Sequence, residues 1–217
     1  QRAIFEQIKS DLENNPKIII VYGPRQVGKT TLVRKILAEM PYKSLEINAD
    51  LHTYIEVLSS RDIDRMKELV GSNELLFIDE AQNIPNIGIN LKILHDSLPN
   101  LRIIVTGSSS FELANQIQEP LTGRTWTYRM YPISIQELQV DNTPFELKSN
   151  LEDYLRFGMY PEVLKMEGKE AKIRYLQELS SAYLYKDILQ LSSIRHADKL
   201  VKLLKLLAFQ VGSEVSV

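Results

Sequence analysis

The first part of the chain alternates short apolar runs with longer segments in which apolar residues recur every three or four positions. Apolar runs of strand length are typical of strands buried on both faces, which have no solvated side. Such runs cover residues 17–22 and 74–79, and further strands are predicted over residues 43–48, 101–106 and 125–130. The periodic segments predict helices over residues 2–12, 30–40, 50–70 and 89–98, with a break near Ser59 and Ser60. This alternation predicts an α/β fold, with a parallel sheet and helices on both faces.

The pattern changes near residues 141–144, and helical segments alone follow. Residues 169–190 form the longest of these, and residues 197–209 carry leucines at helical spacing. We therefore expect three parts. They are an α/β domain over residues 1–142, a helical segment over residues 143–190 and the beginning of a truncated C-terminal domain over residues 191–217.

Composition excludes several classes of protein. The 217 residues are 44% hydrophobic with a formal net charge of −2, so a packed core is expected and global attraction to nucleic acid is not. The chain has no cysteine, which excludes disulfides and thiolate metal sites. No apolar run approaches the roughly 20 residues that span a bilayer, and the polar N-terminus shows no signal peptide. We expect a cytoplasmic protein without a membrane partner.

Residues 23–30 read GPRQVGKT and match the phosphate-binding loop pattern G-x-x-x-x-G-K-S/T in full. The glycines allow the backbone to curl so that its N–H groups point at phosphate oxygens, and the following helix adds the positive end of its dipole. Lys29 is expected at the β- and γ-phosphates, and the Thr30 hydroxyl on magnesium. The predicted ATP contacts are Gly23, Pro24, Arg25, Gln26, Val27, Gly28, Lys29, Thr30 and Thr31.

Three of these loop contacts have alternatives. Arg25 and Gln26 lie at the predicted tip of the loop, where solvent exposure is favoured over a contact with nucleotide. Thr31 has two interpretations that remain open, an α-phosphate contact and a cap for the following helix.

Two adjacent carboxylates, Asp79 and Glu80, end the third predicted strand. Ligands of open α/β sheets bind at the carboxyl ends of the strands. Asp79 is therefore expected to hold magnesium through water, and Glu80 to polarise the water that attacks the γ-phosphate. A solvated acidic turn is the alternative, and the upstream phosphate-binding loop argues against it.

The fourth strand ends in the polar sequence TGSSS. Ser108 is the candidate sensor, whose hydroxyl would contact the γ-phosphate or the attacking water. Ser110 is expected to cap a helix that begins near Phe111.

Taken together, these stretches resemble the prokaryotic AAA-type ATPases that carry a C-terminal domain of unknown function. The resemblance rests on GPRQVGKTTL, LLFIDEAQNI, IIVTGSSSFEL, LTGRTWTYRMYPIS, GMYPEVL and YLYKDIL, which occur in the right order along nearly the whole chain. It implies that another strand lies between the loop strand and the Asp79 strand. It also implies Glu80 as catalytic base, Ser108 as sensor, Arg124 as candidate arginine finger, and a winged-helix-like C-terminal domain that begins at residues 191–217.

The expected activity is magnesium-dependent hydrolysis of ATP that drives a conformational change on an unidentified macromolecular partner. A non-hydrolysing ATP-dependent switch is the first alternative. A small-molecule kinase is the second, although it would need an acceptor pocket and an arginine-rich lid. The resemblance leaves open a homo-oligomer, DNA binding through the truncated domain, and whether Arg124 acts on a neighbouring subunit or pairs with an acid such as Glu119 of its own.

Other candidates receive structural interpretations. Arg156 is expected in a surface salt bridge rather than at the γ-phosphate, and Tyr160-Pro161 in a turn between helices. Trp126 is expected to pack in or over the sheet. A basic stripe is favoured as the solvated face of the last helix over a nucleic-acid contact; it comprises Arg195, Lys199, Lys202 and Lys205.

Overall fold

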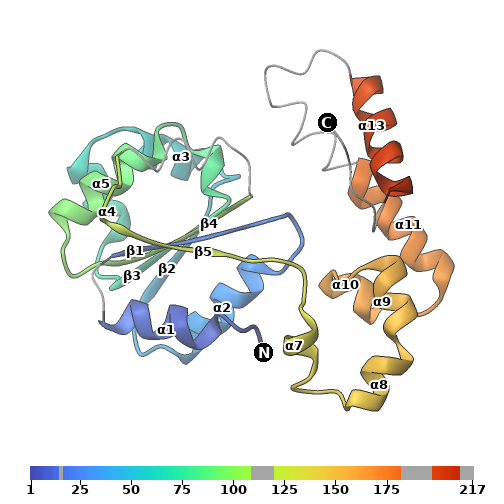
Figure 1. Cartoon of the computed structure of the whole chain (residues 1–217). Coiled ribbons are helices and arrows are strands. Elements are labelled where there is room, and N and C mark those ends of the chain that lie inside the picture. Colours follow the sequence, from blue (N-terminus) through green and yellow to red (C-terminus); the bar gives the residue numbers. More distant parts are fainter. Residues whose placement is uncertain (15–16, 109–119, 182–196, 211–217) are drawn as a thin grey trace. The chain divides into compact units, whose positions relative to one another are not determined.

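The computed structural model of the chain describes residues 1–14, 17–108, 120–181 and 197–210 (Figure 1). It divides into two compact units, residues 1–166 and residues 167–217, which are described separately below. The three-part division over residues 1–142, 143–190 and 191–217 stays a prediction.

The first unit contains a five-stranded sheet whose strand pairs are all parallel. The strands are β1 (Ile18–Gly23), β2 (Ser44–Asn48), β3 (Leu75–Asp79), β4 (Arg102–Ser108) and β5 (Thr125–Arg129). Their order in the sheet is β2-β3-β4-β1-β5, so β4 lies between the loop strand and the strand that ends in Asp79. Both the parallel sheet and this inserted strand are confirmed.

Helices cover both faces of the sheet (Figure 1). On one face lie α1 (Phe5–Asn14) and α2 (Lys29–Glu39), and on the other α3 (His52–Ser59), α4 (Ile63–Val70) and α5 (Ile87–Ser97). Because successive side chains of a strand point to opposite faces, β1 contributes to two cores. Ile19 and Val21 pack in the cluster with α1 and α2, whereas Ile18 and Ile20 pack in the cluster with α3, α4 and α5. The three central strands β3, β4 and β1 are thus buried from both sides, whereas the edge strands β2 and β5 have mostly exposed or partly exposed side chains.

The break predicted in the helical segment over residues 50–70 separates α3 from α4. Arg61 takes a positive φ of 57° there, and its backbone N–H donates to Oδ1 of the buried Asn90 over 2.9 Å. Asp62 then caps α4, because its side chain accepts hydrogen bonds from the backbone N–H groups of Asp64 and Arg65.

Short helices follow β5 in the first unit: α7 (Ile135–Leu138), α8 (Pro144–Ser149), α9 (Leu151–Phe157) and α10 (Pro161–Lys165). Capping boxes begin α7 at Ser134 and α8 at Thr143. Glu137 of α7 forms an ion pair with Arg2 over 3.0 Å and accepts a hydrogen bond from the backbone of Ala3. These bonds connect the helices after the sheet to the segment before α1.

Three expectations for side chains concern this region. The turn between helices comprises residues 158–160, with Tyr160 as the N-cap of α10, whereas Pro161 already lies in the first turn of that helix. Arg156 pairs with Glu152 over 3.0 Å on the surface of α9, also as predicted. Trp126 differs from the expectation, because it lies on the edge strand β5 with 41% of its surface exposed and Lys17 above its ring.

In the second unit the described helices are α11 (Lys169–Leu179) and α13 (Ala197–Phe209). The predicted helix over residues 169–190 is thus observed over its first part, and residues 182–190 lie outside the described ranges. Lys199, Lys202 and Lys205 are exposed on α13, in keeping with the solvated face predicted for them; Arg195 is outside the described part. Across the described residues, no helix combines the length and the apolar character needed to cross a bilayer.

Candidate functional site

The loop between β1 and α2 is built around two glycines that accept no side chain without strain. A Cβ atom added at Gly23 would lie 2.2 Å from the backbone oxygen of Met130, which follows β5. Gly28 has a φ of 93°, in the left-handed region that favours glycine, and it is the N-cap of α2. The motif therefore has its two glycines where the backbone turns and where another strand approaches.

The other loop residues divide by exposure. Val27 is fully buried and anchors the loop in the core beside α1 and α2. Gln26, with a φ of 62°, is exposed at the tip, whereas Pro24 and Arg25 are partly buried. Thr31 is exposed on α2, and because Gly28 is the N-cap, the capping role considered for Thr31 is not observed. The nucleotide contacts of these residues stay predictions.

Lys29 opens α2 and is 4% exposed. Its ammonium Nζ donates to the backbone oxygens of Gly23 and Pro24, each over 3.0 Å. A buried ammonium is costly unless it is hydrogen-bonded, and the loop carbonyls supply such bonds. They hold the charge inside the loop, where a polyphosphate would offer charged oxygens in their place.

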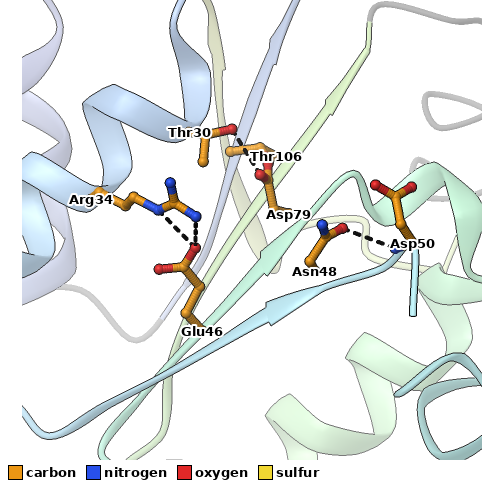
Figure 2. A network of polar contacts seen from close by, with 7 residues as sticks. All are labelled: Thr30, Arg34, Glu46, Asn48, Asp50, Asp79 and Thr106. Atoms are coloured by element: carbon orange, nitrogen blue, oxygen red, sulfur yellow. Dashed lines mark hydrogen bonds and ion pairs between the residues drawn. The ribbon is translucent and has the colours of Figure 1, made fainter. Parts of the chain in front are cut away.

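Thr30, Asp79 and Thr106 come together from α2, β3 and β4 (Figure 2). The Thr30 hydroxyl Oγ1 donates to Asp79 Oδ2 over 2.7 Å, and the Thr106 hydroxyl donates to Asp79 Oδ1. Asp79 is 8% exposed. The predicted magnesium pair Thr30 and Asp79 is thus in direct contact, and a hydroxyl with a carboxylate is the hard-oxygen donor set that fits magnesium. The sequence did not identify Thr106 as a partner of Asp79.

Glu80 turns away from Asp79 although the two are adjacent. Its backbone is left-handed, with φ 54° and ψ 42°, and it is the N-cap of the short helix η1 (Ala81–Asn83). Its carboxylate oxygen Oε2 accepts a hydrogen bond from the Gln82 amide, Nε2. Few non-glycine residues occupy this backbone region, and such strain is concentrated at functional sites. The two carboxylates therefore face different partners, as expected for different roles.

Ser108 is buried at the carboxyl end of β4, 1% exposed. Its backbone N–H donates to Gln82 Oε1 over 3.2 Å. The Gln82 side chain thus contacts both predicted catalytic residues, Glu80 and Ser108. Gln82 was not predicted from the sequence. The one feature that could have pointed to it is its amide side chain two positions after Glu80.

A second set of polar contacts lies beside Asp79 (Figure 2). Arg34 of α2 donates through Nε to Glu46 of β2 over 2.8 Å. This hydrogen bond, together with the charges of Glu46 and Asp79, raises the pKa of Arg34. Next to them, the Asp50 backbone N–H donates to Asn48 Oδ1 over 2.9 Å at the end of β2. These contacts order the segment after β2.

Arg124 lies at the opposite edge of the sheet from the loop. It precedes β5, and its backbone oxygen accepts a hydrogen bond from the N–H of Ile18 at the start of β1. The length of β1, at ~3.3 Å per residue, puts roughly 16 Å between this edge and the edge that carries the phosphate-binding loop. Arg124 therefore does not join the residues around Asp79 in its own subunit.

The partner of Arg124 in its own chain is Asp96. The guanidinium donates through Nε over 2.9 Å and through Nη2 over 3.2 Å to the two carboxylate oxygens. This hydrogen bonding, followed by that of His95, lowers the pKa of Asp96. Glu119, the acid suggested by sequence, lies outside the described residues, as do Ser110 and Phe111 of the predicted helix cap.

Among the described residues, no cluster of three or more His, Asp or Glu side chains could hold a metal ion.

A family model described as an AAA domain matches residues 15–139, which is more than half of the chain. The chain belongs to the AAA-domain family. A second model, for a domain of unknown function, matches residues 148–217. The expected combination, an AAA domain followed by a C-terminal domain of unknown function, is confirmed.

This AAA protein is similar to two uncharacterized proteins of Methanocaldococcus jannaschii. One is 27% identical over 220 residues, covering 93% of this chain and 48% of the relative. The other is 28% identical over 251 residues, covering 97% of this chain and 52% of the relative. The chain thus spans about half the length of these relatives.

Among solved structures, the AAA chain is similar to a Walker-type ATPase of Pyrococcus abyssi. The TM-score is 0.53 at 19% identity, with 87% of this chain and 75% of the other covered. The likeness at this identity concerns the fold, and it agrees with a P-loop NTPase architecture.

Proposed function

We propose that this AAA domain binds ATP with magnesium, hydrolyses it to ADP and phosphate, and passes the resulting conformational change to a macromolecular partner. The observation that carries the proposal is the convergence of Lys29, Thr30 and Asp79 at the carboxyl edge of the sheet, with Glu80 turned aside from them. These groups come from separate elements and meet where an open α/β sheet binds its ligand.

Binding uses groups that are already in place. The backbone N–H groups of the loop and the N-terminus of α2 receive the phosphates, and Lys29 exchanges its loop carbonyls for β- and γ-phosphate oxygens. Thr30 and Asp79 would hold magnesium, with Asp79 acting through water. When bound, the ion neutralises the negative charge of the phosphates.

Hydrolysis adds water across the bond between the γ-phosphorus and the oxygen of ADP. Glu80 accepts a proton from the attacking water as its oxygen bonds to phosphorus, and the bond to ADP breaks in line with the attack. The Ser108 hydroxyl, at the end of the neighbouring strand, contacts the γ-phosphate. Separation of Asp79 and Glu80 by the left-handed turn leaves one carboxylate for magnesium and the other for the proton.

Arg124 is proposed as an arginine finger that acts on a neighbouring subunit of a homo-oligomer. Its distance from the loop in its own chain supports this, because Arg124 meets a γ-phosphate only if a second subunit brings one to the amino edge of the sheet. Binding to another subunit would require Arg124 to leave Asp96. The ion pair between them is exposed at the surface, so breaking it costs little free energy. If Arg124 acts within one subunit, its role is to order the segment before β5.

The experiment that tests the function is phosphate release from ATP and magnesium in the absence of any acceptor. Hydrolysis predicts steady release of phosphate. A non-hydrolysing switch predicts ATP binding in calorimetry without release, and a small-molecule kinase predicts binding with release only after an acceptor is added. The partner, including DNA as a candidate through the C-terminal domain, is then sought with the full-length protein held in its ATP state by Glu80→Gln.

A further inference from the structure

Gln82 occupies a position that the proposed reaction does not yet use. It lies in η1, two residues after Glu80, and is partly buried. Its side-chain amide has a donor end and an acceptor end, and each end is bonded to a different part of the site. Nε2 donates to the Glu80 carboxylate, and Oε1 accepts from the backbone N–H of Ser108.

These two bonds determine the orientation of the amide. A donor is required toward the carboxylate of Glu80 and an acceptor toward the N–H of Ser108, and an amide provides both. Neither a carboxylate nor an apolar side chain of the same length can make the pair. The bond to Ser108 is made by its backbone N–H and does not use its hydroxyl.

The neighbouring Asn83 provides a comparison within η1. Its amide donates to Asp50 Oδ1 over 2.8 Å, on the side of the loop after β2. Asn83 is exposed, and this bond involves neither Glu80 nor Ser108. Two adjacent amides therefore have different functions, one ordering a loop and the other joining two candidate catalytic residues.

We propose that Gln82 is a positioning residue for hydrolysis, which fixes the Glu80 carboxylate toward the attacking water and couples it to the end of β4. This inference rests on the proposed ATPase function. The donated hydrogen bond occupies Glu80 Oε2 and leaves the second carboxylate oxygen to accept the proton of water. Gln82 also bonds to the backbone of Ser108 at the end of β4. If β4 shifts when Ser108 contacts the γ-phosphate, Gln82 therefore moves with it and changes the position of the Glu80 carboxylate.

The test compares Gln82→Met with Asn83→Ala in the full chain. Methionine retains the length of glutamine and removes both hydrogen bonds, so the packing of η1 is preserved. Misplacement of a catalytic group by about 1 Å costs on the order of 100-fold in rate. We expect Gln82→Met to lower kcat by roughly 10- to 100-fold with ATP affinity within about threefold of wild type, and Asn83→Ala to retain kcat.

Gln82→Glu separates the two bonds. Glutamate retains an acceptor for the Ser108 N–H but loses the donor to Glu80 and adds a like charge beside it. A loss of kcat at least as large as that of Gln82→Met is expected. Wild-type kcat in Gln82→Glu would contradict the proposal, because the bond to Glu80 would then be dispensable.

A double variant distinguishes positioning from a general structural disturbance. If Gln82 acts through Glu80, adding Gln82→Met to Glu80→Gln causes no further loss of the residual single-turnover rate. A full additional loss, or equal kcat in Gln82→Met and Asn83→Ala, overturns the inference. These outcomes are separate from failure of the ATPase proposal, which would appear as ATP binding without phosphate release by the wild-type protein.

Discussion

The parallel strands end at a carboxyl edge and begin at an amino edge of the sheet, and the polar groups at these two edges differ in burial. At the carboxyl edge, Lys29, Asp79 and Thr106 are buried and bonded to one another or to the loop backbone. At the amino edge, Arg124 and Asp96 form an exposed ion pair whose side chains are 35% and 43% accessible. At the carboxyl edge, a buried polar group that lost its hydrogen-bond partner would cost free energy. At the amino edge, the exposed ion pair contributes little, so Arg124 can exchange Asp96 for another anion at low cost.

A cavity lies at the amino edge. A cavity of about 710 Å³ is lined there by residues that include Lys67, Asn73, Glu74, Leu98 and Arg102. These residues surround an open space, but none of them belongs to the converging set at the other edge. The position of reactive groups, rather than the size of a cavity, therefore identifies the candidate site in this protein.

The largest expected effect tests whether the amino edge acts on another subunit. Arg124→Ala is expected to reduce ATP hydrolysis by about 10³-fold, because a guanidinium at the γ-phosphate neutralises charge that develops in the transition state. Mixing Arg124→Ala with Glu80→Gln should restore part of the activity, since one subunit supplies the arginine and another the base. Phosphate release measured across protein concentrations checks both expectations.

Full activity of Arg124→Ala at all protein concentrations would contradict the finger. Loss of activity without recovery on mixing would show that Arg124 acts within its own subunit. Arg124 would then not be an arginine finger for a neighbouring subunit. Arg65→Ala is a control, because Arg65 is an exposed arginine of α4; it is expected to retain activity.

The next effect concerns binding at the carboxyl edge. Lys29→Ala should weaken ATP by about 2–4 kcal/mol, because a desolvated ammonium bonded to phosphate is lost. This corresponds to roughly 30- to 1,000-fold in the dissociation constant measured by calorimetry. Lys35→Ala serves as the control, because Lys35 is an exposed residue of the same helix. Equal ATP affinity of Lys29→Ala and wild type would show that Lys29 does not contribute to ATP binding.

Stability should also depend on the carboxyl edge without nucleotide. Thr106→Val deletes the hydroxyl that donates to the buried Asp79 and is expected to cost about 1–3 kcal/mol of unfolding free energy. The same replacement at the exposed Thr127 of β5 should change stability little. Chemical denaturation of both variants compares them directly. Equal stability of the two would show that the bond to Asp79 contributes nothing net.

The smallest effect is a dependence on pH at the amino edge. The pKa of Asp96 is lowered in the folded chain, chiefly by Arg124 and then by His95. A lowered folded pKa means that the pair adds stability above the unfolded value of about 3.9 and loses it as pH falls through the folded value. Asp96→Asn should therefore melt slightly below wild type at pH 7, with the difference vanishing at strongly acid pH. A difference that grows toward acid pH would contradict this linkage.

Much of the fold follows from sequence because burial on both faces leaves a clear pattern. All five predicted strands are present, and their ends differ from the predicted ones by two residues at most. The strand order did not follow from periodicity, because neighbours in a parallel sheet are chosen by contacts between distant segments. The one feature of the order that was expected, a strand between the loop strand and the Asp79 strand, came from the resemblance to AAA-type ATPases.

The candidate site was predictable where the motif is local. The loop glycines lie where the backbone turns, and Thr30 contacts Asp79, because one strand-loop-helix unit and a strand of the same sheet bring them together. The nucleotide and magnesium roles of these residues stay predictions. Gln82 and Thr106 were missed as partners. Their roles depend on a left-handed turn at Glu80 and on the register of β4, which no local pattern specifies.

The central claim is that the carboxyl edge hydrolyses ATP with Glu80 as the base, and one measurement tests it most directly. Phosphate release with ATP and magnesium is compared between wild type and Glu80→Gln, with ATP affinity of both measured by calorimetry. The account predicts steady release by wild type, a loss of about 10²- to 10⁴-fold in Glu80→Gln, and similar ATP affinity for the two proteins. Phosphate release by Glu80→Gln at the wild-type rate would contradict it.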